Sequence, residues 1–121
     1  MSSENKSTVE RYLDGFRRTD HDQILSCLTD DVEWVIPGLF HKTGKHAFDH
    51  EIENDAFTGH PEIAVTRLTE ENDVVVAEGS VRTQRKTGEV LHLAFCDVFE
   101  MRSGRIRRLV SYLMEVKSAG V

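Results

Sequence analysis

Few of the residues that cross-link, break or anchor a chain occur in this sequence. Its 121 residues include only two cysteines, two prolines and one tryptophan. We interpret Cys27 and Cys96 as reduced core thiols, because both stand in apolar segments of a chain without a disulfide framework. A disulfide or a nucleophilic cysteine is the alternative.

Long hydrophobic runs and excess positive charge are also missing. No apolar stretch approaches the roughly 20 residues of a membrane span, and the polar residues 1–7 lack the hydrophobic region of a signal peptide. The formal net charge of −6 repels nucleic-acid backbones and anionic membrane surfaces. We therefore expect a cytoplasmic protein that binds neither nucleic acid nor membranes.

Familiar catalytic motifs are missing as well. The sequence has no glycine-rich phosphate loop, no nucleophile elbow and no cysteine cluster for a metal. This argues against phosphoryl transfer, dinucleotide redox chemistry and serine hydrolysis, and we expect no cofactor. The length and the 30% of charged residues fit one globular domain, residues 1–121.

Helical periodicity dominates the first half of the chain and strand periodicity the second. The capping-box pattern at Ser7 to Glu10 predicts a helix whose apolar face carries Tyr12, and Gly15 inside it suggests close packing. Further predicted elements are a helix after Asp20, a strand at 32–36, a helix at 45–54, and strands at 62–70, 74–85, 89–102 and 105–117. This segregated order predicts an α+β fold with an antiparallel meander.

Both faces of the predicted strand at 89–102 are apolar. Helices can cover only one face of a sheet, so the second needs another cover. A second copy of the chain is the simplest cover, and we predict a homodimer. The two faces carry Leu91, Leu93, Phe95 and Phe99 on one side, and Val90, Ala94, Cys96 and Val98 on the other.

Asp97 is the most informative residue for function, because it interrupts the apolar segment Phe95 to Phe99. A buried carboxylate is costly unless it is paired, hydrogen-bonded or neutralised. One interpretation is a pocket carboxyl that acts as an acid or base, or as a protonated donor. The other is a structural carboxyl satisfied by a backbone amide, Arg82 or Arg107.

Two further candidates need weighing. Tyr12 lies at the edge of the first helix's apolar stripe, where it serves as a core residue or directs its hydroxyl into a cavity. His46 and His50 share one face of the third predicted helix, and we interpret them as a solvent-facing pair. The alternative is a metal site, for which His41 or His60 would supply the third ligand.

Several segments resemble the nuclear transport factor 2-like superfamily, which includes SnoaL-like proteins and ketosteroid isomerases. They are residues 10–13 (ERYL), 28–34 (LTDDVEW) and 97–106 (DVFEMRSGRI). The resemblance covers about residues 5 to 117. It implies three N-terminal helices packed on a strongly curved, mostly antiparallel sheet, which forms a cone with an internal pocket.

The resemblance also implies roles for individual residues. Tyr12 matches the oxyanion-hole tyrosine of ketosteroid isomerases, and Asp97 matches their protonated aspartic acid. Ile36 stands where those enzymes keep the aspartate that moves the proton, and isoleucine cannot do so. The implied pocket-lining residues are Trp34, Ile36, Phe95, Leu109 and Leu113.

The predicted function is therefore a SnoaL-like pocket protein for a small apolar ligand with a carbonyl or phenol-like oxygen. An enzyme of this kind would be a cofactor-independent isomerase, cyclase or lyase. The alternative is a non-enzymatic ligand-binding or dimerisation module, and a third hypothesis is a metal-dependent hydrolase built on His46 and His50.

The inward face of the strand at 74–85 stays open. Glu78, Ser80 and Arg82 share one face, and Val75, Ala77 and Val81 share the other. A bulge at Gly79 would exchange the two faces. If Arg82 pointed inward, it would pair with Asp97 and keep that carboxyl charged.

Overall fold

The computed structural model describes residues 3–117, which form three helices and six strands. The helices are α1 (Glu4–Arg18), α2 (His21–Ser26) and α3 (Lys45–Ile52). The strands are β1 (Leu28–Ile36), β2 (Phe40–Thr43), β3 (Phe57–Glu71), β4 (Val74–Arg85), β5 (Val90–Arg102) and β6 (Arg105–Glu115). The predicted α+β class is confirmed.

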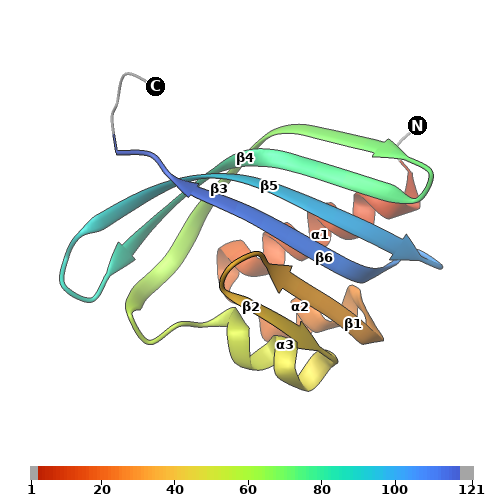
Figure 1. Ribbon diagram of the computed structural model, residues 1–121, viewed down its shortest axis with the longest axis horizontal. Coiled ribbons are helices and arrows are strands. Elements are labelled where there is room, and N and C mark those ends of the chain that lie inside the picture. Colours follow the sequence, from red (N-terminus) through yellow and green to blue (C-terminus); the bar gives the residue numbers. More distant parts are fainter. Residues whose placement is uncertain (1–2, 118–121) are drawn as a thin grey trace.

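All six strands belong to one sheet, in the order β2-β1-β6-β5-β4-β3. Neighbours are antiparallel except β1 and β6, so β3 to β6 form the predicted meander (Figure 1). The strongly curved cone is not what forms. The sheet stays open, with β2 and β3 as its edges, because helices rather than its own closure cover the inner face.

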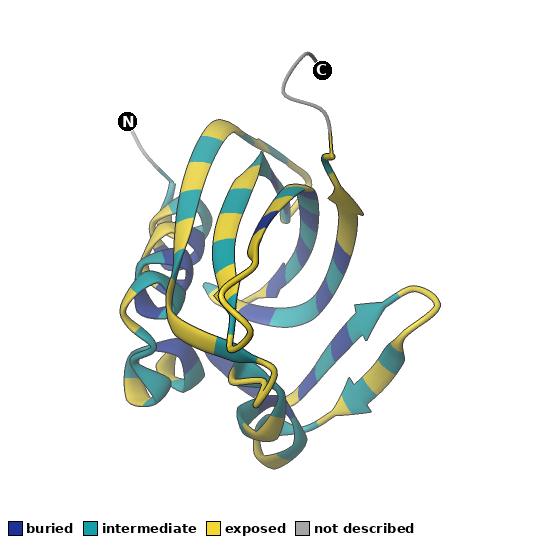
Figure 2. Ribbon diagram, turned by 90° about the vertical axis from the view of Figure 1, so that its left-hand side faces the viewer, coloured by how far each residue is buried: buried dark blue, intermediate teal, exposed yellow. Residues whose placement is uncertain are grey.

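The helices pack on the sheet at two places. α1 lies against β3, β4 and β6, and α3 lies against β1. Burial alternates along the strands as a result, and Figure 2 shows the alternation as colour bands. On β5 every inward side chain from Leu91 to Met101 is buried except the half-buried Leu93, while the outward side chains between them are partly or fully exposed.

The start of α1 differs from the prediction by one turn. Ser3 caps the helix, because its hydroxyl accepts a hydrogen bond from the Lys6 amide at 2.9 Å. Ser7 therefore lies inside the helix rather than at its start. The sequence offers serine at both positions, and the longer helix satisfies more backbone groups.

Strand boundaries differ most at the edges of the sheet, and the inner strand β1 also begins at Leu28, four residues before the predicted start at Val32. The short edge strand β2 was not predicted, and it forms because the Pro37-Gly38 turn returns the chain so that Ile36 faces Phe40. β3 begins at Phe57, five residues before the predicted start at Glu62. Exposed edge strands carry little apolar alternation, so periodicity underestimates them.

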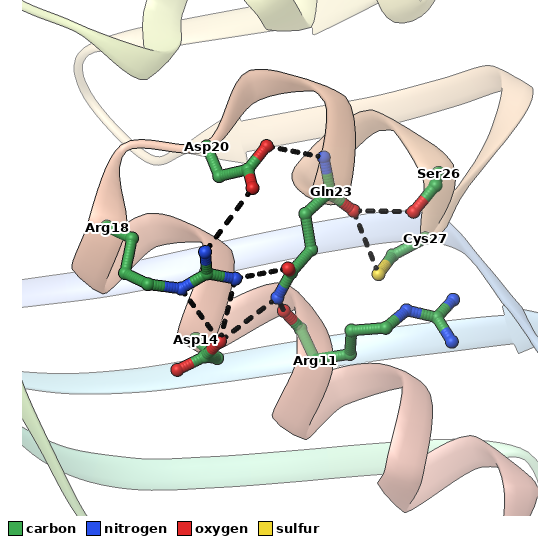
Figure 3. Close-up of polar contacts among 7 residues, drawn as sticks. All are labelled: Arg11, Asp14, Arg18, Asp20, Gln23, Ser26 and Cys27. Atoms are coloured by element: carbon green, nitrogen blue, oxygen red, sulfur yellow. Dashed lines mark hydrogen bonds and ion pairs between the residues drawn. The ribbon is translucent and has the colours of Figure 1, made fainter.

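Polar contacts link the end of α1 to α2 (Figure 3). The Asp20 carboxylate caps α2 by accepting from the Gln23 amide at 3.0 Å, as predicted. The Arg18 side chain lies near the carboxylates of Asp14 and Asp20, at 3.1 and 3.5 Å. A Cβ on Gly15 would lie 2.9 Å from Ile24, so close helix packing explains this glycine.

Within residues 3–117, no helix is long and apolar enough to cross a membrane.

Candidate functional site

A pocket of about 290 Å³ lies between α1 and the inner face of the sheet. Its buried lining residues include Tyr12, Trp34, Phe95, Asp97 and Ser111. Its exposed lining residues, which we call the mouth, are Glu53, Asn54, Gly59 and Leu113. The pocket therefore has an apolar, aromatic interior with two polar groups from adjacent strands, and a more polar entrance.

Tyr12 reaches the pocket because α1 turns its apolar stripe toward the sheet. Its ring makes edge contacts with Phe16, Phe48 and Phe99, at centroid distances of 5.1, 6.2 and 5.4 Å. Such contacts fix the ring in place. Only 2% of the residue is exposed, yet the residue lines the pocket. The hydroxyl is thus carried by a rigid, buried ring.

Asp97 lies on the inward face of β5 and is 9% exposed. Burial raises the pKa of this carboxyl to about 7, and the Ser111 side chain, a donor to its charged form, lowers the pKa only in part. At neutral pH the carboxyl consequently exists in both protonation states. It can donate a hydrogen bond in one state and accept a proton in the other.

Within residues 3–117, no arginine forms an ion pair with Asp97. Arg82 pairs with Glu62 at 2.9 Å, and Arg107 pairs with Glu100. β4 and β5 pair without interruption, so Ala77 rather than Arg82 faces inward beside Asp97. The register shift near Gly79 belongs to the neighbouring β3, between Val65 and Arg67. The open question about this strand is therefore decided, and Arg82 points away from the pocket.

Ser111 connects Asp97 to the tryptophan. It lies opposite Asp97 in the β5–β6 register, and its Oγ accepts a hydrogen bond from Trp34 Nε1 at 3.1 Å. Because the serine oxygen already accepts a hydrogen bond from the indole N–H, the serine hydroxyl can donate its own proton to the Asp97 carboxylate. Ser111 was not among the residues selected from the sequence, although a serine between Leu109 and Leu113 on an inward face was a usable signal.

The Tyr12 phenol stays neutral in this setting. Burial raises its pKa well above the ordinary value of 10.0, and the nearby negative charge of Asp97 raises it further. A neutral phenol is a hydrogen-bond donor. Tyr12 and protonated Asp97 are thus two hydrogen-bond donors that line the same apolar pocket, where such bonds are stronger than in water.

The structure places most of the sequence-selected residues around this one pocket. Tyr12, Trp34, Ile36, Phe95, Asp97 and Leu113 line it. Leu109 does not, because its side chain is fully buried in the core beside α1 and β5. Lining residues that the sequence reasoning missed include Phe16, Ile63, Val81, Thr83 and Leu93, which are ordinary inward residues until the pocket is formed.

A charged cluster flanks the mouth. The ring of His21 lies 2.6 Å from both the Asp49 and the Glu53 carboxylates. The hydrogen bond to Asp49, and to a smaller extent the one to Glu53, raises the pKa of His21. Thr19 Oγ1 lies 2.7 Å from His60 Nδ1. His21 carries no signal in the sequence, because its partners Asp49 and Glu53 lie 28 and 32 positions away along the chain.

The histidines weighed as metal ligands lie away from this pocket. His46 and His50 are exposed on α3, with their Nε2 atoms 3.3 Å apart. Among residues 3–117, no group of three or more His, Cys, Asp or Glu side chains is arranged to hold a metal ion. The predicted third ligands, His41 and His60, face Glu33 and Thr19 instead.

Comparison with known proteins places this geometry in a family. The family model for the SnoaL-like domain matches residues 9–109. The chain belongs to the SnoaL-like domain family. This domain shares its nuclear transport factor 2-like, ketosteroid isomerase-like fold with many solved structures. Comparison with curated proteins finds no match.

Three solved structures illustrate what this SnoaL-like domain is similar to. TerC, co-crystallised with polyporic acid, is 28% identical, with 90% of each chain covered and a TM-score of 0.82. An NTF2-like protein of unknown function from Burkholderia pseudomallei is 24% identical (93% and 92% covered, TM-score 0.86). An LEH-like epoxide hydrolase from M. tuberculosis is 21% identical (92% and 83% covered, TM-score 0.81). Structures of this fold carry names as different as epoxide hydrolase, polyketide cyclase and ketosteroid isomerase.

Proposed function

We propose that this SnoaL-like domain binds a small apolar molecule and stabilises negative charge on its carbonyl or phenol-like oxygen with Tyr12 and Asp97. The reaction would be an isomerisation, a cyclisation or a lyase-type elimination next to the carbonyl. The observation that carries this proposal is the buried Asp97 carboxyl, which lines the pocket with Tyr12 and has no cationic partner. Co-crystallisation of the related TerC with polyporic acid supports a small-molecule ligand.

The chemistry follows from the two protonation states of Asp97. While it is protonated, Asp97 donates to the ligand oxygen alongside Tyr12, and both donors oppose the charge that develops there. When it is ionised, it can accept a proton from a carbon next to the carbonyl or from water. Ile36 at the pocket wall supplies no proton transfer, so one carboxyl would have to serve both steps or share them with the substrate.

Binding of naphthol, a planar fluorescent phenol, tests the proposal. Wild type should bind it, and Tyr12→Phe and Asp97→Val should each weaken binding by about tenfold, the effect of one hydrogen bond. Tyr112→Phe is the matched control, because the hydroxyl of this half-exposed tyrosine lies outside the pocket. The proposal fails if wild type does not bind naphthol, or if neither pocket variant weakens binding.

A second candidate function is non-enzymatic ligand binding. The pocket lining favours it, because the interior offers few groups that could transfer a proton. Among the described residues, the titratable side chains that line the pocket away from its mouth are Asp97 and Tyr12. A binding module would still bind naphthol through Tyr12 and Asp97 but would convert no carbonyl substrate. Screening enones and hydroxy-ketones for Asp97-dependent turnover separates the two functions.

We also propose that the protein is a homodimer that pairs through the outer face of its sheet. Opposing residues form an apolar patch there: Val76, Val98 and Val110 in one row, Cys96 with Tyr112, and Ala94 with Met114. Tyr112 and Met114 are 52% and 70% exposed. The acidic groups beside the patch, Glu78 and Glu100, are paired with arginines, so the face can meet its own copy without charge repulsion.

A further inference from the structure

The charged groups that line the pocket are all of one sign. Among the described residues they are Asp97 in the interior and Glu53 at the mouth, with no lysine, arginine or histidine in the lining. We propose that the pocket also binds small organic amines as cations, with the ammonium group held between the aromatic side chains and the Asp97 carboxylate. This ligand class does not depend on the proposed reaction.

Aromatic rings form much of the wall. Tyr12, Phe16, Trp34, Phe57 and Phe95 come from four different elements and surround the same space. A ring face attracts an ammonium group electrostatically, and the attraction grows when the cation is desolvated. Several rings around one carboxylate are the arrangement that favours quaternary or tertiary ammonium ions over metal ions, which require ligand oxygen or nitrogen atoms.

The Asp97 carboxylate supplies the negative charge that an ammonium group needs. The protein offers this buried carboxylate a serine hydroxyl but no positive charge, since Arg82 and Arg107 are bound to Glu62 and Glu100. An unpaired buried carboxylate is costly. A bound cation would provide the missing counter-charge, whereas a carboxylate or phosphate ligand would be repelled.

The pocket volume limits the size of the ligand. The volume of about 290 Å³ lies just below the range of roughly 300–1,000 Å³ that is usual for small-molecule sites. One aromatic ring that carries a methylated ammonium group is of suitable size. At the mouth, Glu53 adds a second carboxylate, which His21 contacts at 2.6 Å.

Benzyltrimethylammonium tests the proposal, because its charge is permanent and does not titrate. Neopentylbenzene, in which carbon replaces the nitrogen, is the neutral isostere. Binding can be followed by the fluorescence of Trp34, the only tryptophan in the chain. Wild type should bind the cation about tenfold more tightly than the isostere. Asp97→Asn should reduce this preference severalfold while retaining binding of the isostere.

Glu78→Gln is the control for a general loss of negative charge, because Glu78 lies on the opposite face of the sheet and pairs with Arg67. It should leave the preference for the cation unchanged. Equal binding of cation and isostere by wild type would overturn the proposal. So would an Asp97→Asn protein that keeps the full preference.

The pH dependence separates this proposal from the proposed function. The cation needs ionised Asp97, so its binding should tighten between about pH 5.5 and 8.5. A neutral ketone, which can only accept a hydrogen bond from protonated Asp97, should instead bind more weakly over the same range. Around Asp97, β4 and β6 present Ala77 and Ser111, which do not titrate. Tyr12 from α1 and Cys96 on β5 have pKa values raised above 10.0 and 9.0, so neither ionises in this range.

Glu53 lies at the mouth, and His21 and His60 contact Glu53 and Thr19 beside it, so Asp97→Asn, which keeps all three, is the control for their contribution. Cation preference without naphthol binding would leave the amine site standing and remove the proposed function. Naphthol binding with no cation preference would remove the amine site and leave the proposed function standing.

Discussion

Asp97 on β5 lies directly opposite Ser111 on β6, and the same serine accepts the indole N–H of Trp34 at 3.1 Å. Three strands therefore contribute to one hydrogen-bonding arrangement at the buried end of the pocket. Ser111 gives the carboxylate a donor, but burial outweighs that donor, so the pKa of Asp97 is about 7. This balance decides the behaviour of the site near neutral pH.

The stability of the protein should fall as the pH rises toward 7. The pKa of Asp97 is raised from 3.8 in the unfolded chain to about 7 in the fold, so the native state holds a proton that the unfolded state releases. The stabilisation that this bound proton gives to the native state is lost as the pH rises to the pKa of Asp97 in the folded protein. Relative to Asp97→Asn, wild type should lose about 2–3 kcal/mol between pH 5 and 8. Urea unfolding of both proteins measures this, and parallel pH profiles would contradict it.

Ser111→Ala should raise the pKa of Asp97 further, because the charged form loses its donor. Trp34 also loses its acceptor, so its fluorescence should report the change. A pH titration of fluorescence should have a midpoint near 7 in wild type and a higher one in the variant. Ser80→Ala, an exposed serine on the outer face, should leave the midpoint where it is. An unchanged midpoint in Ser111→Ala would show that the serine does not act on Asp97.

Gly79→Ala should destabilise the protein and distort the pocket wall. An added Cβ would lie 2.0 Å from the Ala64 carbonyl oxygen and 2.9 Å from the Phe95 ring. The backbone of β3 cannot yield cheaply, so the expected loss in unfolding free energy is about 1–3 kcal/mol or more. Ser80→Ala, the next residue along β4, serves as the control. Equal stability of the two variants would rule out the close approach.

His21→Gln should weaken the link between α2 and α3 at low pH. The carboxylates of Asp49 and Glu53 raise the pKa of His21 above 6.5, so its stabilisation is fully present below pH 6.5 and disappears as the pH rises through the folded pKa. The cluster is partly exposed, so the loss should stay below about 1 kcal/mol. Melting temperatures at low and high pH measure it. His50→Gln, which removes an exposed histidine from α3, is the matched control, and an equal loss in both variants would contradict the prediction.

Met114→Lys should convert the proposed dimer to a monomer. Met114 is 70% exposed in the single chain, and a lysine there would place like charges against each other across a two-fold axis. Sedimentation of wild type should give twice the mass of the chain at micromolar concentration. A monomeric wild type would refute the dimer, and Leu39→Lys, an exposed leucine at the β1–β2 turn, should not alter the mass.

The amino-acid sequence by itself determined the order and type of most elements. Strong alternation fixed β4 at Val74–Arg85 to the residue, and Asp20 marked the start of α2 through a local hydrogen bond. Such features depend on residues a few positions apart, so they can be read along the chain. The edge strand β2 and the first turn of α1 were missed, because packing and turn geometry decided them.

The sequence also singled out Asp97 and Tyr12, because a carboxyl within an apolar strand and a tyrosine on an apolar helix face are conspicuous without any structure. Only the tertiary structure decided what surrounds them. The sheet register put Ser111 opposite Asp97, turned Arg82 out to Glu62, and buried Leu109 away from the pocket. Contacts between residues far apart in the chain depend on how the strands align, and that alignment is set by the packing of the whole domain.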